Sequence, residues 1–312
     1  MRESAGKLDG RPLFGGVEAG GTKFVCAVGA APDDIIEHET FPTSAPEETL
    51  VDVCAFFRKQ MKKYGPLRAI GVGAFGPVDI NPLSQTFGRI LSTPKAAWRN
   101  VDILNRLSDA LNCPVAIDTD VNCALYGESR FGAGRDSDNL AYITIGTGVG
   151  AGLMINRTIV YGESHPEVGH IFCPKRPEDE NFPGSCPFHG DRCFEGLTAG
   201  PAIMARWGMS ASHLPPDHPG LRTIAHYISL LCLNILLSFS PARIILGGGV
   251  MKQSRLYPLV RAALCENLCG YCGARKGLGD FGEFIVPPEL GDASGVAGAL
   301  AIAYDLYVSR KA

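Results

Sequence analysis

The protein has 312 residues, of which 46% are hydrophobic and 20% charged, and its formal net charge is −3. This balance is typical of a globular protein, and the length favours two lobes over a single core. The mildly acidic charge argues against nucleic acid and anionic membranes as partners, so we expect a small-molecule ligand.

Residues 1–13 are polar and are predicted to form an N-terminal tail, because no apolar stretch follows that would make them a secretory signal. The longest apolar run, within 228–239, is interrupted by serine and asparagine, and we expect it to be too short to span a bilayer. The 11 cysteines are scattered along the chain, which favours buried thiols and metal ligands over a disulfide framework. We therefore predict a cytoplasmic protein that binds no membrane.

The first predicted lobe covers residues 14–130 and begins with two strands, at 13–17 and 22–28. They are joined by the segment Glu18-Ala19-Gly20-Gly21, and we call Gly20 to Lys23 the first glycine turn. The elements expected next are a helix from Pro46 to Gly65, a buried strand at 69–74, an amphipathic helix at 101–111, a strand at 115–117, and a helix opened by residues 118–122.

The second predicted lobe covers residues 131–293 and repeats the pattern of strand, glycine turn and strand at 140–155. Its turn, Gly146 to Gly148, is the second glycine turn. The elements expected after it are a long apolar helix at 221–239, a buried strand at 244–246, a helix at 256–267 and a closing helix at 294–308, within a stretch 294–312 that packs back on the first lobe. Between these cycles, residues 164–200 are irregular and rich in Pro, Gly, Cys and His, so we expect a functional loop there, called the Cys/His loop.

The glycine turns indicate a phosphate ligand. Glycines let backbone N–H groups approach phosphate oxygens, while Thr22 and Lys23 add a hydroxyl donor and a charge. An ordinary hairpin turn explains the first glycine turn equally well by itself. A third glycine turn, Gly247 to Gly249, also follows an apolar strand, and three such turns together favour one polyphosphate ligand.

Asp118 and Asp120 follow a predicted strand and open a helix, which places their carboxylates where α/β sheets bind ligands. Aspartate is also a favoured helix N-cap, so we assign capping to one and chemistry to the other. A carboxylate that accepts the proton of an attacking hydroxyl, with Mg2+ and amide groups on the phosphates, suffices for phosphoryl transfer.

The Cys/His loop contains a candidate metal site. Its predicted ligands are two thiols and two imidazoles, a set typical of a closed tetrahedral Zn2+ site: His170, Cys186, His189 and Cys193. Cys173 is a competing ligand. The alternative is that these cysteines are buried and these histidines lie at the surface without a metal. This alternative is less favourable, because a loop so rich in proline and glycine would not keep its shape by burial alone.

Taken together, these segments resemble the ROK family of sugar kinases, and within it the bacterial fructokinase branch. The resemblance extends from Phe14 to Tyr307 and rests on GGVEAGGTKFVCAVG from Gly15, GAFGPVD from Gly73, TPKAAW from Thr93, TDVN from Thr119, ITIGTGVGAG from Ile143, HPEVGH from His165 and ILGGGVM from Ile245. It implies an α/β chain with the two-lobed actin-like ATPase fold, which is ribonuclease H-like, with ATP in the interlobe cleft.

The resemblance also implies an activity: an ATP-dependent fructokinase that makes fructose 6-phosphate with Mg2+, acts as a homodimer and uses Asp120 as general base. His170 would both bind Zn2+ and face the sugar. The implied substrate-binding residues are Gly76, Pro77, Asn122, Glu167, His170 and Glu195. The implied ATP-binding residues are Gly20, Gly21, Thr22, Lys23, Thr147, Gly148, Gly200 and Pro201 on the phosphate side, and Gly247, Gly248 and Gly249 at the adenosine.

Three positions depart from the family pattern. Glu18 stands where the family usually has Asp, which favours a water-mediated contact with Mg2+ over a direct one. Thr119 stands where glucose and hexosamine kinases usually have Asn, which weighs against glucose. Arg192 looks like an insertion between His189 and Cys193, so we expect a local rearrangement of the metal loop.

Several alternatives to a fructokinase remain. Within the family, a glucokinase, a mannokinase or an acylmannosamine kinase is the nearest, because discrimination between similar hexoses can be modest. From another class, a sugar-responsive transcription regulator is disfavoured, since the residues before the first strand leave no room for a DNA-binding module. A zinc-stabilised module without catalysis is disfavoured by the intact Asp120 and glycine turns.

Overall fold

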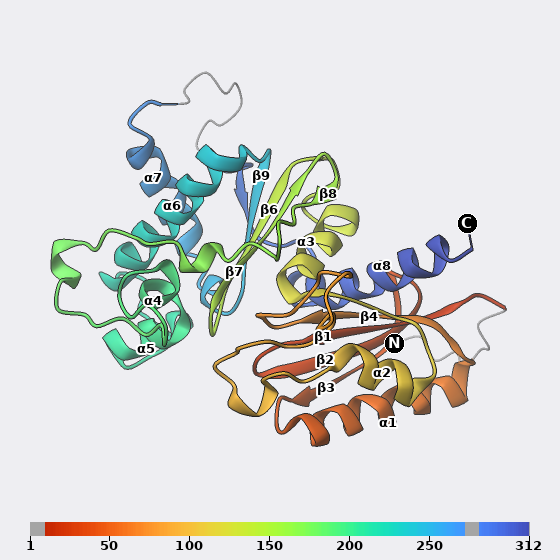
Figure 1. Ribbon diagram of the computed structural model, residues 1–312. Coiled ribbons are helices and arrows are strands. Elements are labelled where there is room, and N and C mark those ends of the chain that lie inside the picture. The colour runs from red at the N-terminus through yellow and green to blue at the C-terminus, as the bar shows by residue number, and fades with distance from the viewer. Residues whose placement is uncertain (1–9, 272–280, 312) are drawn as a thin grey trace. The chain divides into compact units, whose positions relative to one another are not determined.

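The computed structural model describes residues 10–271 and 281–311 (Figure 1), so most of the predicted tail lies outside the described residues. The chain divides into two compact units, each with its own five-stranded sheet. Unit 1 comprises Met1–Phe131, Gly162–His165 and Asp292–Ala312, and unit 2 comprises Gly132–Tyr161 and Pro166–Gly291.

The sheet of unit 1 has the strand order β3-β2-β1-β4-β5. Its strands are β1 (Leu13–Ala19), β2 (Lys23–Ala31), β3 (Asp34–Pro42), β4 (Leu67–Ala74) and β5 (Val115–Thr119). β1 pairs antiparallel with β2 and parallel with β4, and β4 pairs parallel with β5. The carboxyl ends of β1, β4 and β5 therefore meet at one edge of the sheet.

Helices cover both faces of this sheet (Figure 1): α1 (Pro46–Tyr64) and α2 (Ile103–Leu111) on one, α3 (Asp120–Phe131) and α8 (Ser294–Ser309) on the other. α1 has Pro46 in its first turn, where a missing N–H costs nothing, and is followed by the C-cap residue Gly65, which has a φ of 107°. On the opposite face, α8 approaches the sheet so closely that a Cβ at Gly71 would lie 1.8 Å from the carbonyl oxygen of Ala299.

The sheet of unit 2 has the strand order β10-β9-β6-β7-β8. Its strands are β6 (Leu140–Ile145), β7 (Val149–Ile155), β8 (Thr158–Ile159), β9 (Arg243–Gly247) and β10 (Ile285–Val286). Its helices are α4 (Phe194–Thr198), α5 (Gly200–Trp207), α6 (Gly220–Phe239) and α7 (Leu256–Leu268). Short 3-10 helices, η1 to η6, lie at Ala96–Trp98, Val168–His170, Pro177–Asp179, Ala211–His213, Val250–Lys252 and Gly291–Ala293.

The apolar run expected to be too short for a bilayer belongs to α6, which is long and apolar enough to cross one by length and composition. The run at 228–239 is the C-terminal part of this helix, which begins at Gly220. In the structure 61% of its apolar window is buried, and Ile224, Ile228 and Cys232 are fully covered in the core of unit 2. α6 is packed as the core helix of this unit.

Candidate functional site

Three loops of unit 1 are brought together by strand register. Ala19 is paired with Ala74, and Ala74 with Thr119, so β1, β4 and β5 end side by side. The first glycine turn follows β1, the Gly76–Pro77 segment follows β4 and Asp120 follows β5. The sheet edge thus gathers a glycine turn and a carboxylate, the groups needed to hold a phosphate and to accept a proton.

The first glycine turn is held in shape by its own backbone and by Thr43. Gly20 N donates to Lys23 O at 3.0 Å. Thr43 donates from its amide to Thr22 O at 3.0 Å and from its hydroxyl to Gly20 O at 2.8 Å. Within the described part of the chain, the amides of Gly21 and Thr22 have no such acceptor. They are the two N–H groups of the turn that an anion can use.

The Glu18 side chain lies on the same face as α8. Its Oε2 atom is buried without a hydrogen-bond partner among the described residues, and a Cβ at Gly295 would lie 2.7 Å from it. Burial raises the pKa of Glu18 above its ordinary value, and the Lys23 charge lowers it in part. A carboxylate in this setting is ready to be stabilised by a cation or by bound water.

Asp120 is the first residue of α3, and the N-cap before it is Thr119. Thr119 Oγ1 accepts the Asn122 amide at 3.0 Å, so the expectation that one of the two aspartates caps this helix was wrong. Thr119 supplies the capping oxygen because it directly precedes the first turn of α3 and lies three positions before Asn122, whose amide it accepts. Asp120 Oδ1 accepts from Val121 N at 2.8 Å, and the residue is half-buried.

Asp118, in contrast, is buried and supports the helix start. Its Oδ1 accepts from Thr119 N at 2.7 Å and from Asn122 Nδ2 at 2.8 Å. Asn122 is itself only 2% exposed. Burial raises the pKa of the Cys123 thiol, and the charges of Asp118, Asp120 and Glu18 raise it further.

The Gly76–Pro77 peptide bond is cis, and the segment contacts His165. The amide of Val78 donates to His165 Nε2 at 3.4 Å. The HPEVGH motif is therefore divided, since His165 packs with unit 1 while Pro166 to His170 belong to unit 2.

In unit 2 the second and third glycine turns meet the start of α5. Gly200 N donates to Gly146 O at 2.7 Å, and a Cβ at Gly146 would lie 3.8 Å from Gly249 N. Gly248 has a φ of 89°, and a Cβ there would lie 2.4 Å from Ile145 O, so this position requires glycine. Together with Pro201 in the first turn of α5, these residues expose a helix N-terminus beside two glycine turns, an arrangement suited to phosphate groups.

Glu195, on α4, reaches the second glycine turn. Its Oε2 accepts from Val149 N at 3.1 Å, and a Cβ at Gly148 would lie 2.7 Å from the same oxygen. Gly169, next to His170, packs so closely on β7 that a Cβ would lie 2.0 Å from Val149 O. The Cys/His loop thus packs directly against the second glycine turn.

The four predicted metal ligands lie together, with all ligand atoms within 4.8 Å of one another: His170, Cys186, His189 and Cys193. The two Nδ1 atoms are 3.3 Å apart, and His170 Nδ1 lies 3.7 and 3.8 Å from the two sulfurs. Tetrahedral Zn2+ with bonds of about 2.3 Å to sulfur and about 2.0 Å to nitrogen gives separations of about 3.3 Å between nitrogens and about 3.5 Å between nitrogen and sulfur. The donor set fits Zn2+.

Cys173 is outside this group, and its thiol donates to Pro174 O at 3.6 Å. Arg192, the apparent insertion, stacks its guanidinium 5.3 Å from the centre of the Phe172 ring, and its amide donates to His189 O. The extra residue is therefore accommodated in a turn that still brings His189 and Cys193 together.

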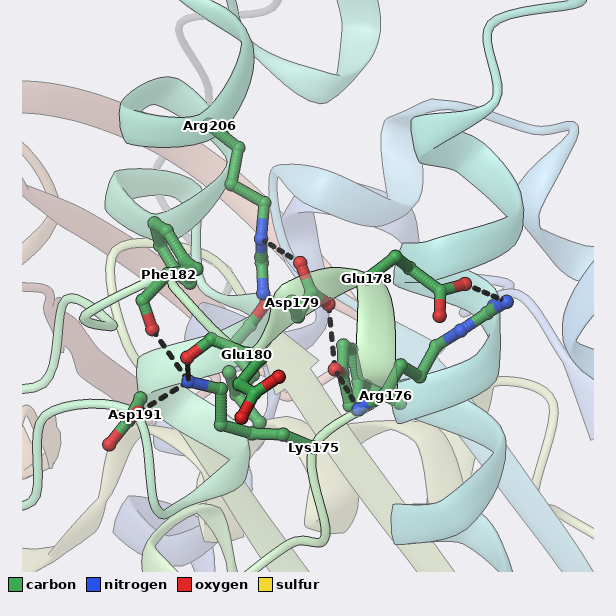
Figure 2. Close-up of polar contacts among 10 residues, drawn as sticks. Lys175, Arg176, Glu178, Asp179, Glu180, Phe182, Asp191 and Arg206 are labelled. Carbon is green, nitrogen blue, oxygen red and sulfur yellow. Dashed lines mark hydrogen bonds and ion pairs between the residues drawn. The ribbon is translucent and has the colours of Figure 1, made fainter.

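A second set of contacts braces the Cys/His loop internally and fixes it to α5 and α6 (Figure 2). Lys175 Nζ donates to the carbonyls of Glu180 and Phe182 and to Asp191 Oδ2, at 2.6, 2.9 and 2.6 Å. Asp179 accepts from Arg206 Nε at 3.1 Å and from the hydroxyl of Tyr227 at 2.7 Å. The loop, expected to be irregular throughout, in fact contains η2, η3 and α4.

Two residues near the first glycine turn had no role in the sequence prediction. Thr43 holds the turn, and Lys95 approaches it, since a Cβ at Gly21 would lie 3.5 Å from Lys95 Cε. Lys95 belongs to the TPKAAW segment, but no spacing rule connects it to a turn so far away in sequence. The contact becomes visible only in the folded chain.

The sequence model of the ROK family matches residues 14–305 of the chain. Fructokinase of Pediococcus pentosaceus is 42% identical over 93% of this chain and 97% of its own, and fructokinase of Zymomonas mobilis is 37% identical over 94% and 97%. A ROK family glucokinase from Streptomyces griseus, solved with glucose and AMPPNP, has the same fold with a TM-score of 0.74 at 24% identity, over 94% of this chain and 99% of its own.

Proposed function

The chain belongs to the ROK family, and from this premise we propose that it transfers the γ-phosphoryl group of ATP to fructose, giving fructose 6-phosphate and ADP. Relatives named fructokinase, 37% and 42% identical over more than nine-tenths of the chain, support this activity. The protein is a phosphotransferase that acts on a sugar.

One observation carries the mechanism: Asp120 and the first glycine turn follow strands that end at the same sheet edge. Asp120 accepts the proton of the sugar 6-hydroxyl while the oxygen of that hydroxyl attacks the γ-phosphorus of ATP. The bond from this phosphorus to the ADP oxygen breaks at the same time. Asp118 and Asn122 act by positioning, because their hydrogen bonds fix the start of α3.

The phosphates of ATP are held by backbone amides. In unit 1 the free amides of Gly21 and Thr22, with Lys23, favour an anion. In unit 2 the amides of Thr147 and Gly148 do the same, beside the positive end of α5 at Gly200 and Pro201, and Gly247 to Gly249 adjoin the adenosine. Mg2+ supplies positive charge to the phosphates when bound with ATP, and the buried Glu18 carboxylate would hold it through water.

The proposed sugar-binding residues are Gly76, Pro77 and Asn122 of unit 1 and Glu167, His170 and Glu195 of unit 2. Zn2+ at the four-ligand cluster fixes the Cys/His loop without taking part in phosphoryl transfer. The 10 free cysteines among the described residues support a reducing, cytoplasmic location. A homodimer that binds neither membrane nor nucleic acid completes the proposal.

A panel of hexoses with ATP and Mg2+ tests the substrate, with kcat/KM measured for fructose, glucose, mannose and N-acetylmannosamine. Fructose should be preferred. A tenfold or greater preference for another sugar, about 1.4 kcal/mol in transition-state binding, would reject fructose as the substrate. Thr119→Asn is an informative variant, because Asn also caps helices well while adding the amide typical of glucose kinases, and it should shift the ratio towards glucose.

A further inference from the structure

The Lys95 side chain lies beside the first glycine turn, although the two are far apart in sequence and Lys95 has no assigned role. A Cβ at Gly21 would lie 3.5 Å from Lys95 Cε, so the end of the side chain lies next to the turn. The ammonium is one bond further and within reach of an anion held by the turn.

The segment that carries Lys95 is fixed to the same structure as the turn. Trp98 Nε1 donates to Ser44 O at 2.9 Å, and Ser44 directly follows Thr43, which holds the turn through two hydrogen bonds. The Trp98 ring, only 2% exposed, packs at 5.3 Å from Phe24 and 5.6 Å from Phe75, measured between ring centroids. The rigid aromatic contact therefore sets the position of Lys95 relative to the turn.

The charge on Lys95 is available. Among residues 10–271 and 281–311, no carboxylate forms an ion pair with it and no acceptor binds its ammonium. Burial raises the pKa of Glu18, and the charge of Lys23, within the turn itself, lowers it in part. The turn offers two unpaired amides and the Lys23 charge, and Lys95 adds a second ammonium beside them, a set that suits a phosphate group better than a neutral sugar.

We propose that Lys95 is a catalytic residue whose ammonium binds the phosphoryl group as it moves from ATP to the sugar. The inference rests on the proposed kinase activity and adds a cation that stabilises charge on the transferred oxygens. Lys95 takes no proton and forms no covalent bond in this role. The ammonium already contacts the γ-phosphate of bound ATP, and its effect is largest in the transition state, where charge is spread over the equatorial oxygens of the phosphoryl group.

The test compares Lys95→Met, Lys95→Arg and a matched control, Lys62→Met, which removes an exposed lysine of α1. Steady-state kinetics with fructose and ATP give kcat and both KM values, and calorimetry gives the Kd of Mg-ADP and of Mg-AMPPNP. Melting temperatures of all three variants should match the wild type, because Lys95 is not part of the core.

We expect Lys95→Met to lower kcat on the order of a hundredfold, as for loss of one transition-state donor, and to change KM for fructose little. AMPPNP binding should weaken at least about fivefold while ADP binding stays within about twofold, since only the analogue carries a γ-phosphate. Lys95→Arg should recover much of the loss, and Lys62→Met should behave as wild type.

Equal weakening of ADP and AMPPNP, an increase confined to KM for fructose, or unchanged kcat would overturn the assignment. The calorimetric comparison does not need turnover. If the wild type phosphorylates no hexose, the proposed function fails, yet selective loss of AMPPNP affinity still identifies Lys95 as a γ-phosphate ligand.

Discussion

Replacing Asp120 by Asn tests the general base, with Asp118→Asn as its matched partner two residues away. The amide of the Asp120→Asn variant keeps an oxygen that can accept from the backbone N–H of Val121, so the start of α3 should persist. Loss of a negative charge in the first turn of a helix costs about 0.3–1 kcal/mol of unfolding free energy. Loss of a general base lowers kcat about 10²- to 10⁴-fold, equivalent to about 2.7–5.5 kcal/mol of activation free energy.

Asp118→Asn should show the opposite balance. Asp118 is buried and its carboxylate accepts two hydrogen bonds, so removal of its charge should cost about 1.5–3 kcal/mol of unfolding free energy. Its effect on kcat should be smaller than that of Asp120→Asn, because it acts through the position of α3.

Urea unfolding and steady-state kinetics on both variants separate the two roles. The expected pattern is a stable, nearly inactive Asp120→Asn protein and a less stable, partly active Asp118→Asn protein. The reverse pattern, with near-normal kcat in Asp120→Asn, would make Asp118 the base. The acid limb of the kcat profile should also disappear in the Asp120 variant, since no carboxylate remains there to be protonated.

Three further predictions concern stability. The purified protein should contain about one Zn2+ per chain, and elemental analysis that finds no zinc in the wild type would refute the metal site. Cys186→Ser should remove the Zn2+ and lower the melting temperature. It should also raise KM for both fructose and ATP, because the Cys/His loop packs on the second glycine turn. Burial raises the pKa of Glu18 in the folded state above its ordinary value of 4.5. The protein is therefore most stable, with respect to this group, below pH 4.5, and it loses that stability as the pH rises through the folded-state pKa. Glu18→Gln should therefore increase the urea midpoint at pH 7.5 without Mg2+ but not at pH 4, and equal midpoints at pH 7.5 would contradict this. Asp179→Asn should lower the free energy of unfolding by about 3–5 kcal/mol, because it leaves Arg206 buried without its counter-charge. Arg157→Met, which breaks an exposed ion pair, should lower it by less than about 1 kcal/mol. Similar losses in both variants would refute the role of Asp179 in fixing the Cys/His loop.

Most of the fold could be predicted from sequence where burial and local signals agree. The strands at 140–145 and 149–155 coincide with β6 and β7, because apolar residues run up to a glycine turn on both sides. β3 was not predicted. It is an edge strand, its sequence DIIEHETFP is half polar and its side chains are largely exposed, so nothing but pairing with β2 marks it as a strand.

The candidate site was predictable in its residue types but not in its contacts. The cluster of His170 and Cys186 follows from ligand chemistry, and Asp120 from its place after a strand. The N-cap at Thr119, the bond between Glu195 and Val149, and the approach of Lys95 to Gly21 depend on how distant segments pack. Periodicity and composition carry no information about such distances.

The position of α8 in the sequence constrains how the protein is made on the ribosome. The Phe14 ring, at the start of β1, is covered by Tyr304 and Tyr307, with centroids 5.5 Å away in both cases. Val296 and Leu300 complete the same apolar cluster. A nascent chain that has synthesised the whole first sheet and α3 therefore still exposes the part of that face that α8 covers, until α8 emerges after all of unit 2. Chaperone contact during translation should concentrate on that uncovered face of β1 and β4.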